Sequence, residues 1–261
     1  AADSANQRVF GFAGADRISL GLAGAEGWGG LGDDWISNGD GEQKLYGEDG
    51  DDVLVASGGN DELYGGIGND ALQGGADDDL LEGGDGADWL AAGSGSDVLR
   101  GGEGSDYLEG SSSWAPYQGS LPTVPDGATL IAAAPHWWIA RDAQNNLLLS
   151  NWGENPHYAP DEGDVLDGGA GNDIIAAGDG DDLVLGGDGD DVGQGNGGDD
   201  VIFGGSGDDS FLGDTNLGRD ADIVGDDYLD GGDGADVLAG QGGADVVIGG
   251  DGADMLFGDY T

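Results

Sequence analysis

Aspartate recurs at one phase of a nine-residue repeat through most of the chain. The repeat has the form G-G-x-G-x-D-x-U-x, where U is apolar, and clear copies begin at Gly29, Gly65 and Gly186. Its carboxylates and glycine carbonyls are hard oxygen donors, which suit Ca²⁺ with its six to eight ligands at about 2.3–2.6 Å. Mg²⁺ needs a tighter octahedron, and Zn²⁺ prefers nitrogen and sulfur ligands, which are nearly absent from a chain with two His and no Cys. The repeat therefore predicts calcium binding.

The copies fill two blocks of the sequence, and we number the positions within each copy from 1 to 9. Nine consecutive copies run from Gly29 to Glu109, and eleven run from Ala159 to Phe257. Position 8 is apolar in eighteen of the twenty copies, and the exceptions are Gly193 and Asp220. Only 37% of the chain is hydrophobic, so this phase is not a chance pattern.

The repeat predicts an all-β fold, a parallel β-roll in the form of a flattened solenoid. Positions 1 to 6 are expected to form a turn, since glycine allows positive φ and close backbone approach. Positions 7 to 9 are expected to form a short strand whose middle side chain faces the interior. Two copies complete one coil, and the position 8 side chains stack into an aliphatic ladder between two parallel sheets. We expect two such rolls, one from each block.

The charge of the chain limits its partners. It has 54 Asp and Glu against 6 Lys and Arg, and a net charge of −48. Nucleic acid and anionic membranes are polyanions, so the charge disfavours both as partners and favours cations. The apolar content argues against a disordered acidic tail or a Gly-rich linker. No apolar run approaches the roughly 20 residues of a membrane span.

These repeats resemble the repeats-in-toxin (RTX) family of bacterial proteins that leave the cell by type I secretion. The resemblance covers about three quarters of the chain and rests on a specific motif. It implies that position 6 Asp side chains of successive coils, together with turn carbonyls, hold Ca²⁺. The ligands implied in the first block are Asp34, Asp52, Asp61, Asp70, Asp79, Asp88, Asp97 and Asp106. Those implied in the second are Asp164, Asp173, Asp182, Asp191, Asp200, Asp209, Asp227, Asp236, Asp245 and Asp254.

The same resemblance implies a location and a folding mechanism. Position 6 residues two copies apart share an edge of the roll, and counting such pairs within each block gives about 13 Ca²⁺. One counted pair is Asp209 with Asp227. The ions would bring the net charge from −48 to about −22. Without them the carboxylates repel, so we expect an expanded chain that folds on calcium binding after export, in a secreted or cell-surface protein. The chain opens without an initiator Met or a leader, and we expect a piece of a longer protein.

Three places depart from the pattern. Gln43 occupies position 6 of the second copy, and Gly218 does so in the copy from Gly213 to Ala221, which also places Asp220 at position 8. We expect this last copy to bulge and to interrupt the calcium row on its edge. Residues 1–28 match loosely, with a register slip near Gly24, and are expected to form a degenerate coil or cap in which Asp16 is a further candidate ligand.

The segment between the blocks carries no repeat. The chain thus divides into a cap at 1–28, a first roll at 29–110, an insertion at 111–158 and a second roll at 159–261. In the insertion, Ala128–Ala140 and Leu147–Trp152 predict a hairpin that covers the end of one roll. The alternative is aromatic stacking on a glycan or a partner protein. The candidate residues for that alternative are Trp137, Trp138, Trp152, His136 and Arg141.

Outward-facing strand positions are more apolar than a free surface requires. Position 7 of one sheet carries a column that predicts a docking face, and position 9 of the other sheet carries Tyr46 and Tyr64. The column consists of Trp35, Val53, Ala71, Trp89 and Tyr107.

No catalytic activity is expected. The H-E-x-x-H motif of zinc proteases is absent, and nothing in the sequence brings His136 or His157 to a serine. The sequence favours a calcium-binding structural module of a secreted or cell-surface bacterial protein. The alternatives are a glycan- or partner-binding module, and an accessory module of a polysaccharide-modifying enzyme.

Overall fold

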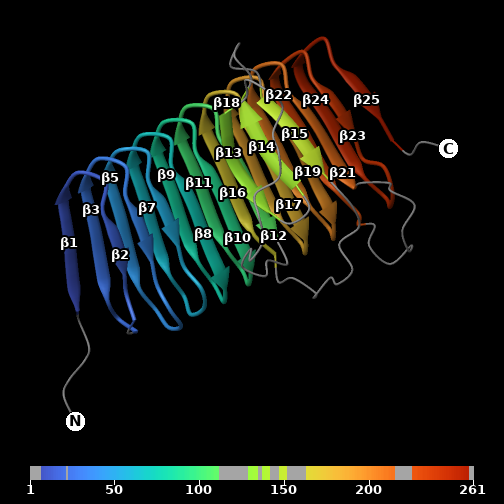
Figure 1. Ribbon diagram of the computed structural model, residues 1–261. Helices are drawn as coiled ribbons and strands as arrows, with labels where there is room; N and C mark the ends of the chain where they lie inside the picture. Colours follow the sequence, from blue (N-terminus) through green and yellow to red (C-terminus); the bar gives the residue numbers. More distant parts are fainter. Residues whose placement is uncertain are drawn as a thin grey trace. The chain divides into compact units, whose positions relative to one another are not determined.

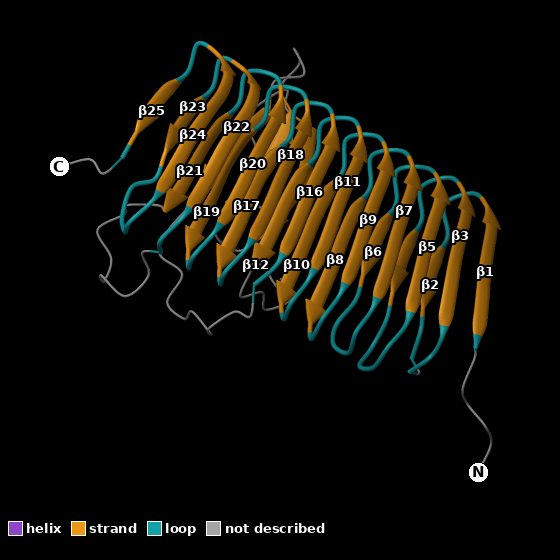
Figure 2. Cartoon of the chain, turned by 180° about the vertical axis from the view of Figure 1, so that it is seen from behind, coloured by secondary structure: helices purple, strands orange, loops and turns teal. Residues whose placement is uncertain are grey.

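A computed structural model describes residues 7–21, 23–111, 129–134, 137–141, 147–151, 163–214 and 225–258. The chain divides into two compact units, of which the first combines Ala1–Ser112 with Pro160–Thr261 and the second is Ser113–Ala159. The described residues form strands and loops without any helix, and therefore no helix that could cross a membrane (Figure 2).

The first unit is a parallel β-roll made of two eleven-stranded sheets, in which the strands of a sheet follow one another in chain order (Figure 1). Sheet 1 contains β1 (Arg8–Ala13), β3 (Glu26–Leu31), β5 (Lys44–Asp49), β7 (Glu62–Ile67), β9 (Leu80–Asp85), β11 (Val98–Glu103), β16 (Val165–Ala170), β18 (Leu183–Asp188), β20 (Val201–Ser206), β22 (Tyr228–Gly234) and β24 (Val246–Gly252). Sheet 2 contains β2 (Arg17–Ser19), β4 (Trp35–Ser37), β6 (Val53–Val55), β8 (Ala71–Ala76), β10 (Trp89–Ser94), β12 (Tyr107–Ser111), β17 (Ile174–Asp179), β19 (Val192–Gly197), β21 (Ser210–Asp214), β23 (Val237–Ala239) and β25 (Met255–Phe257).

The two blocks of repeats form one roll, so the expectation of two separate rolls is wrong. β11 pairs with β16 in sheet 1, where Leu99 is the partner of Leu166. β12 pairs with β17 in sheet 2, where Leu108 is the partner of Ile175. Both sheets and the core therefore continue from the first block directly into the second.

Most strands are longer than the repeat predicts. In β7, positions 7 to 9 of one copy continue into positions 1 to 3 of the next, and only positions 4 to 6 remain as the turn. The expected six-residue turn is thus too long. The strand continues because glycine at position 2 adopts a left-handed backbone conformation, as Gly66 does with φ +122°.

Position 8 builds the core, as the sequence predicts. Its side chains form one continuous buried cluster along the roll, from Ile18 to Leu238. Gly193 breaks the apolar pattern but not the packing, since it is the strand partner of Phe211. A Cβ on Gly193 would overlap the Phe211 ring and lie 2.8 Å from its Cδ1. The large ring therefore fills the space that the glycine leaves.

The described residues before Gly29 stack in the regular register of the roll. β1 pairs with β3, and β3 pairs with β5, each at an offset of eighteen residues, as Arg8, Glu26 and Lys44 show. The predicted register slip near Gly24 is therefore wrong. The copy at residues 20–28 has Gly27 at position 8, and Leu20 fills the space beside it.

Apart from the segment between the two blocks, the eighteen-residue offset of the described strands is broken at one further place, after β21. β20 pairs with β22 and β21 pairs with β23 at an offset of 27 residues, as for Val201 with Tyr228 and Ser210 with Val237. One repeat length of sequence is thus left out of the stacking between Asp214 and Gly225, and the Gly225 N–H donates to Asp214 Oδ1 at 3.4 Å. The predicted copy with Gly218 and Asp220 falls there, and both residues lie outside the described part of the chain.

The second unit contains a three-stranded antiparallel sheet in the order β13 (Thr129–Ala134), β14 (Trp137–Arg141) and β15 (Leu147–Asn151). The predicted hairpin is present as β14 and β15. The predicted first strand is divided in two, and the sequence at the division contains Pro135, which has no N–H for a ladder. His136, Trp152 and His157 lie outside the described residues.

Outward-facing aromatic residues form a ladder over the first coils of sheet 1. The rings of Phe10, Trp28, Tyr46 and Tyr64 stack with centroids 4.6, 5.3 and 5.1 Å apart. Position 7 beside them alternates in charge, with ion pairs Arg8–Glu26 and Lys44–Glu62. On sheet 2, Trp35 is 40% exposed and Trp89 is buried. The docking face expected there remains a prediction.

Candidate metal centre

Each long edge of the roll carries one row of acidic side chains from position 6 of successive coils. The first row consists of Asp16, Asp34, Asp52, Asp70, Asp88, Asp106, Asp173, Asp191, Asp209, Asp236 and Asp254. The second row begins with Gln43 and continues with Asp61, Asp79, Asp97, Asp164, Asp182, Asp200, Asp227 and Asp245.

In every row member after the first, one carboxylate oxygen accepts a hydrogen bond, and these bonds form a ladder along the row. The Asp34 N–H donates to Oδ1 of Asp52 at 2.7 Å, and the Asp52 N–H donates to Oδ1 of Asp70 at 2.8 Å. The same bond recurs from coil to coil. Because the acceptor is a side chain and the donor is the backbone of the preceding coil, the bond fixes the carboxylate orientation.

The other oxygen, Oδ2, is buried and accepts no hydrogen bond in most members of the rows. This holds for Asp34, Asp52, Asp61, Asp70, Asp79, Asp88, Asp106, Asp173, Asp191, Asp200, Asp209, Asp227 and Asp236. A buried carboxylate oxygen without a partner is costly, and a bound cation would remove that cost. The last members, Asp245 and Asp254, are partly exposed.

Backbone carbonyls face the same space as Oδ2. A Cβ placed on Gly83, at position 1, would overlap Oδ2 of Asp88 and lie 2.7 Å from the carbonyl oxygen of Gly101 in the next coil. The glycine thus leaves open a cradle lined by a carboxylate and a carbonyl of two coils. Within the described residues, no three acidic or His side chains meet closely enough to hold a metal by themselves. Carbonyls are therefore needed to complete a ligand set, and this all-oxygen set fits Ca²⁺.

Burial raises the pKa of several of these carboxyl groups above the ordinary value of 3.8. The pKa of Asp79 is raised to about 8 and that of Asp70 to about 7, chiefly by desolvation and further by neighbouring row members. The backbone N–H of the preceding coil partly offsets the rise in both. Charged carboxylates in this position need a counter-charge, which a divalent cation supplies.

Both rows continue without a break across the segment between the two blocks and across the 27-residue offset after β21. The Asp97 N–H donates to Asp164 Oδ1 and the Asp106 N–H donates to Asp173 Oδ1, over 67 residues of sequence. The pair of Asp209 with Asp227 is wrong, because Asp227 follows Asp200 and Asp236 follows Asp209, each 27 residues later. The predicted interruption of a row is therefore absent. The continuous rows contain more pairs of successive Asp residues than the estimate of about 13 ions assumed. That estimate counted pairs within each block separately.

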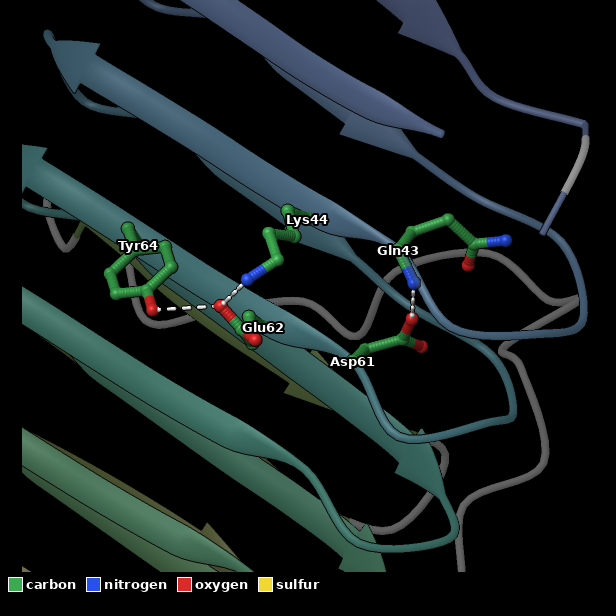
Figure 3. A network of polar contacts seen from close by, with 5 residues as sticks. All are labelled: Gln43, Lys44, Asp61, Glu62 and Tyr64. Carbon is green, nitrogen blue, oxygen red and sulfur yellow. Dashed lines mark hydrogen bonds and ion pairs between the residues drawn. The ribbon is translucent and has the colours of Figure 1, made fainter. Parts of the chain in front are cut away.

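The two rows begin differently. The Asp16 N–H donates to Asp34 Oδ1 at 2.7 Å, so Asp16 has the ladder position of a first-row member. In the second row, Gln43 is buried and its backbone N–H donates to Asp61 Oδ1 at 2.7 Å (Figure 3). Its backbone N–H keeps the ladder, but its neutral side chain contributes no charge to the row. The nearby Lys44, Glu62 and Tyr64 belong to the outer face of sheet 1 and not to the row (Figure 3).

Two sets of acids were missed by sequence reasoning. Position 5 forms a second, exposed ladder of opposite direction, in which the Asn69 N–H donates to Asp51 Oδ1 and the Asp51 N–H donates to Asp33 Oδ1. The frequent Asp or Asn at position 5 signals this ladder. The other is Asp214, a buried acid at position 2, which only its burial reveals.

The sequence matches the family of RTX calcium-binding nonapeptide repeats over residues 46–81, 82–112, 161–193, 185–216 and 224–258. The chain belongs to the RTX repeat family. No curated protein matches it. Membership establishes calcium as the cation and a bacterial protein as the context. The RTX motif thus accounts for the position 6 Asp, the position 8 ladder and the glycine cradles described above.

Proposed function

We propose that this RTX roll is a structural module that folds when it binds calcium, in a secreted or cell-surface bacterial protein, and that it has no catalytic role. The observation that carries the proposal is the buried Oδ2 of the row members, which accepts no hydrogen bond in residues such as Asp34, Asp70 and Asp88. Each stacked coil adds two such groups, so stacking alone accumulates buried negative charge.

In this proposal the position 6 residues are calcium ligands. Oδ2 and turn carbonyls coordinate the ion, and Oδ1 holds the carboxylate in place by accepting the N–H of the preceding coil. Bound calcium supplies positive charge between coils that otherwise repel one another. A site built from two coils exists only when the coils are stacked, so the free energy of calcium binding becomes free energy of folding. A chain exported where calcium is scarce and released where it is abundant would fold only after release.

Far-UV circular dichroism of the whole chain at neutral pH tests this mechanism. We expect an unfolded spectrum in EGTA and a cooperative gain of sheet signal in millimolar CaCl₂. MgCl₂ at the same concentration is the control and should give little or no folding, because Mg²⁺ dehydrates reluctantly and needs a tighter octahedron. Equal sheet content in EGTA and in calcium would contradict the proposal.

A second candidate function is binding of a glycan or a partner protein by the second unit. Ser113–Ala159 is compact by itself and holds four of the seven Trp residues, namely Trp114, Trp137, Trp138 and Trp152. Glycan-array binding that is lost in Trp137→Ala and Trp138→Ala variants, with calcium-dependent folding retained, would support it. Unchanged binding in both variants would reject these two residues as the site.

A further inference from the structure

Asp214 is a buried acid outside the two rows. It ends β21 at position 2 of its coil, beside Asn196 of the neighbouring strand. Its side chain is 1% exposed, and its Oδ2 accepts no hydrogen bond. In the described repeats the other acid at position 2 is Glu48, which is exposed. A buried carboxylate oxygen with no partner at this place points to a ligand.

The surroundings of Asp214 are those of a row site. The preceding residue, Gly213, forms the cradle, since a Cβ there would overlap Oδ2 of Asp227 and lie 2.7 Å from the carbonyl oxygen of Gly240. The Asp214 N–H donates to that same carbonyl at 3.2 Å. Asp214 thus leaves the backbone directly beside the carboxylate and the carbonyl that border the cradle.

Asp214 adds one acid to the charges that surround this point of the row. The pKa of Asp214 is raised to about 6, chiefly by burial and also by Asp245 and Asp199, while the N–H groups of Gly225 and Gly242 partly offset the rise. The pKa of Asp227 is raised to about 7, chiefly by burial, and Asp214 is the first of the neighbouring charges that contribute to the rise. The carboxylates of Asp214 and Asp227 are therefore close enough to interact.

We propose that Asp214 is an additional calcium ligand, which joins Asp227 and the Gly240 carbonyl at the step between Asp227 and Asp245. An ordinary step of the row has no carboxylate from position 2. Because affinity for Ca²⁺ rises with the number of charged ligands, this step becomes the tightest site of the second row. The inference rests on the calcium binding of the roll and adds a ligand that the nonapeptide motif does not contain.

The experiment is a calcium titration against a chromophoric chelator, with circular dichroism on the same samples. In Asp214→Asn, which keeps an oxygen to accept the Gly225 N–H, we expect the tightest class of sites to weaken about tenfold. The roll should still fold in saturating calcium. The control is Asp233→Asn, an exposed position 3 acid of β22, which removes one charge away from the cradle and should shift affinity by less than about twofold.

A second variant removes the same charge with a smaller side chain. Asp214→Ser keeps a polar group beside the Gly225 N–H, and we expect the same weakening of the tightest class of sites as in Asp214→Asn. A wild-type chain that binds no calcium would reject the proposed function itself. Calcium-dependent folding with unchanged affinity in Asp214→Asn, or in Asp214→Ser if the first variant does not fold, would overturn this inference alone.

Discussion

The two oxygens of a position 6 carboxylate have different surroundings. Oδ1 accepts the N–H of the preceding coil, as Asp88 does from Asp70 at 2.8 Å, and Oδ2 faces the glycine cradle. The periodic sequence predicts which residues are candidate ligands, because no other residue type recurs so strictly at that phase. It does not predict this division, since the hydrogen bond joins residues of different coils.

The raised pKa values give the roll a pH dependence whose sign can be worked out. The pKa of Asp52 is about 6, that of Asp70 about 7 and that of Asp79 about 8 in the folded roll, against an ordinary value of 3.8. The folded roll without metal therefore holds protons that the unfolded chain has lost. The contribution of these carboxyl groups to the stability of the metal-free roll is fully present below about pH 4. It is lost as the pH rises through about 6 to 8.

We therefore expect acidification and calcium to replace one another. In EGTA, sheet content measured by circular dichroism should rise between pH 8 and pH 5. In calcium, protons compete for the same oxygens, and the affinity of such a site should fall about tenfold per pH unit below its pKa. Asp79→Asn should reduce the pH dependence, whereas Asp49→Asn at an exposed position should not. Sheet content in EGTA that falls on acidification would contradict the prediction.

The core of the roll tolerates a residue at position 8 that is not a large apolar one. Gly193 is a defect by the repeat pattern, but the ring of Phe211 occupies its space from the next strand of sheet 2. The exchange of volume between two coils cannot be predicted from either copy alone. It becomes visible only when the eighteen-residue offset brings the two residues together.

This packing predicts a coupled pair of substitutions. Gly193→Leu restores the repeat pattern but overlaps the Phe211 ring, so it should destabilise the calcium-bound roll by about 1–3 kcal/mol. Phe211→Leu leaves unfilled space above Gly193 and should cost about 1 kcal/mol or more. The double variant should be more stable than the sum of the two effects predicts, as measured by urea unfolding in saturating calcium. Additive effects would show that the two residues do not share one space.

The irregularity after β21 shows a limit of periodic reasoning. The sequence left out between Asp214 and Gly225 equals one repeat in length, so the period of the chain continues without a visible break. Only Gly218 at position 6 and Asp220 at position 8 indicate that this copy is not a coil. The unbroken period therefore led to the prediction that Asp227 follows Asp209. In the structure Asp227 lies on the opposite edge of the roll from the one predicted.

Deletion of residues 215–223 should therefore leave the roll intact. The offset between β20 and β22 would become the ordinary eighteen residues, and the Asp200 to Asp227 step would be kept. We expect the same calcium stoichiometry by native mass spectrometry and a thermal midpoint in calcium that is not lowered. Deletion of 201–209, a true repeat with the same length, is the matched control and should remove one Asp from the first row and shift the register. Equal loss of calcium in both deletions would contradict the assignment.

At the scale of the whole molecule, the sequence predicts the architecture but not its continuity. The repeat alone indicates two parallel sheets, an aliphatic ladder and acidic edges. It cannot show whether the blocks join, because the non-repeat segment is not a whole number of repeats and the phase on its far side is undetermined. The pairing of Leu99 with Leu166 and of Leu108 with Ile175 decides that question in favour of one roll.

A single roll should fold as one unit, and the distribution of Trp allows a test. Deletion of residues 112–160 turns the offset of 67 residues between Asp97 and Asp164 into the regular eighteen and removes Trp114, Trp137, Trp138 and Trp152. The remaining Trp28, Trp35 and Trp89 all lie before the insertion, whereas circular dichroism reports on both blocks. Since neighbouring coils of a solenoid stabilise one another, we expect fluorescence and circular dichroism to follow coincident calcium transitions. A fluorescence transition separated from the sheet signal would show that the blocks fold as two rolls.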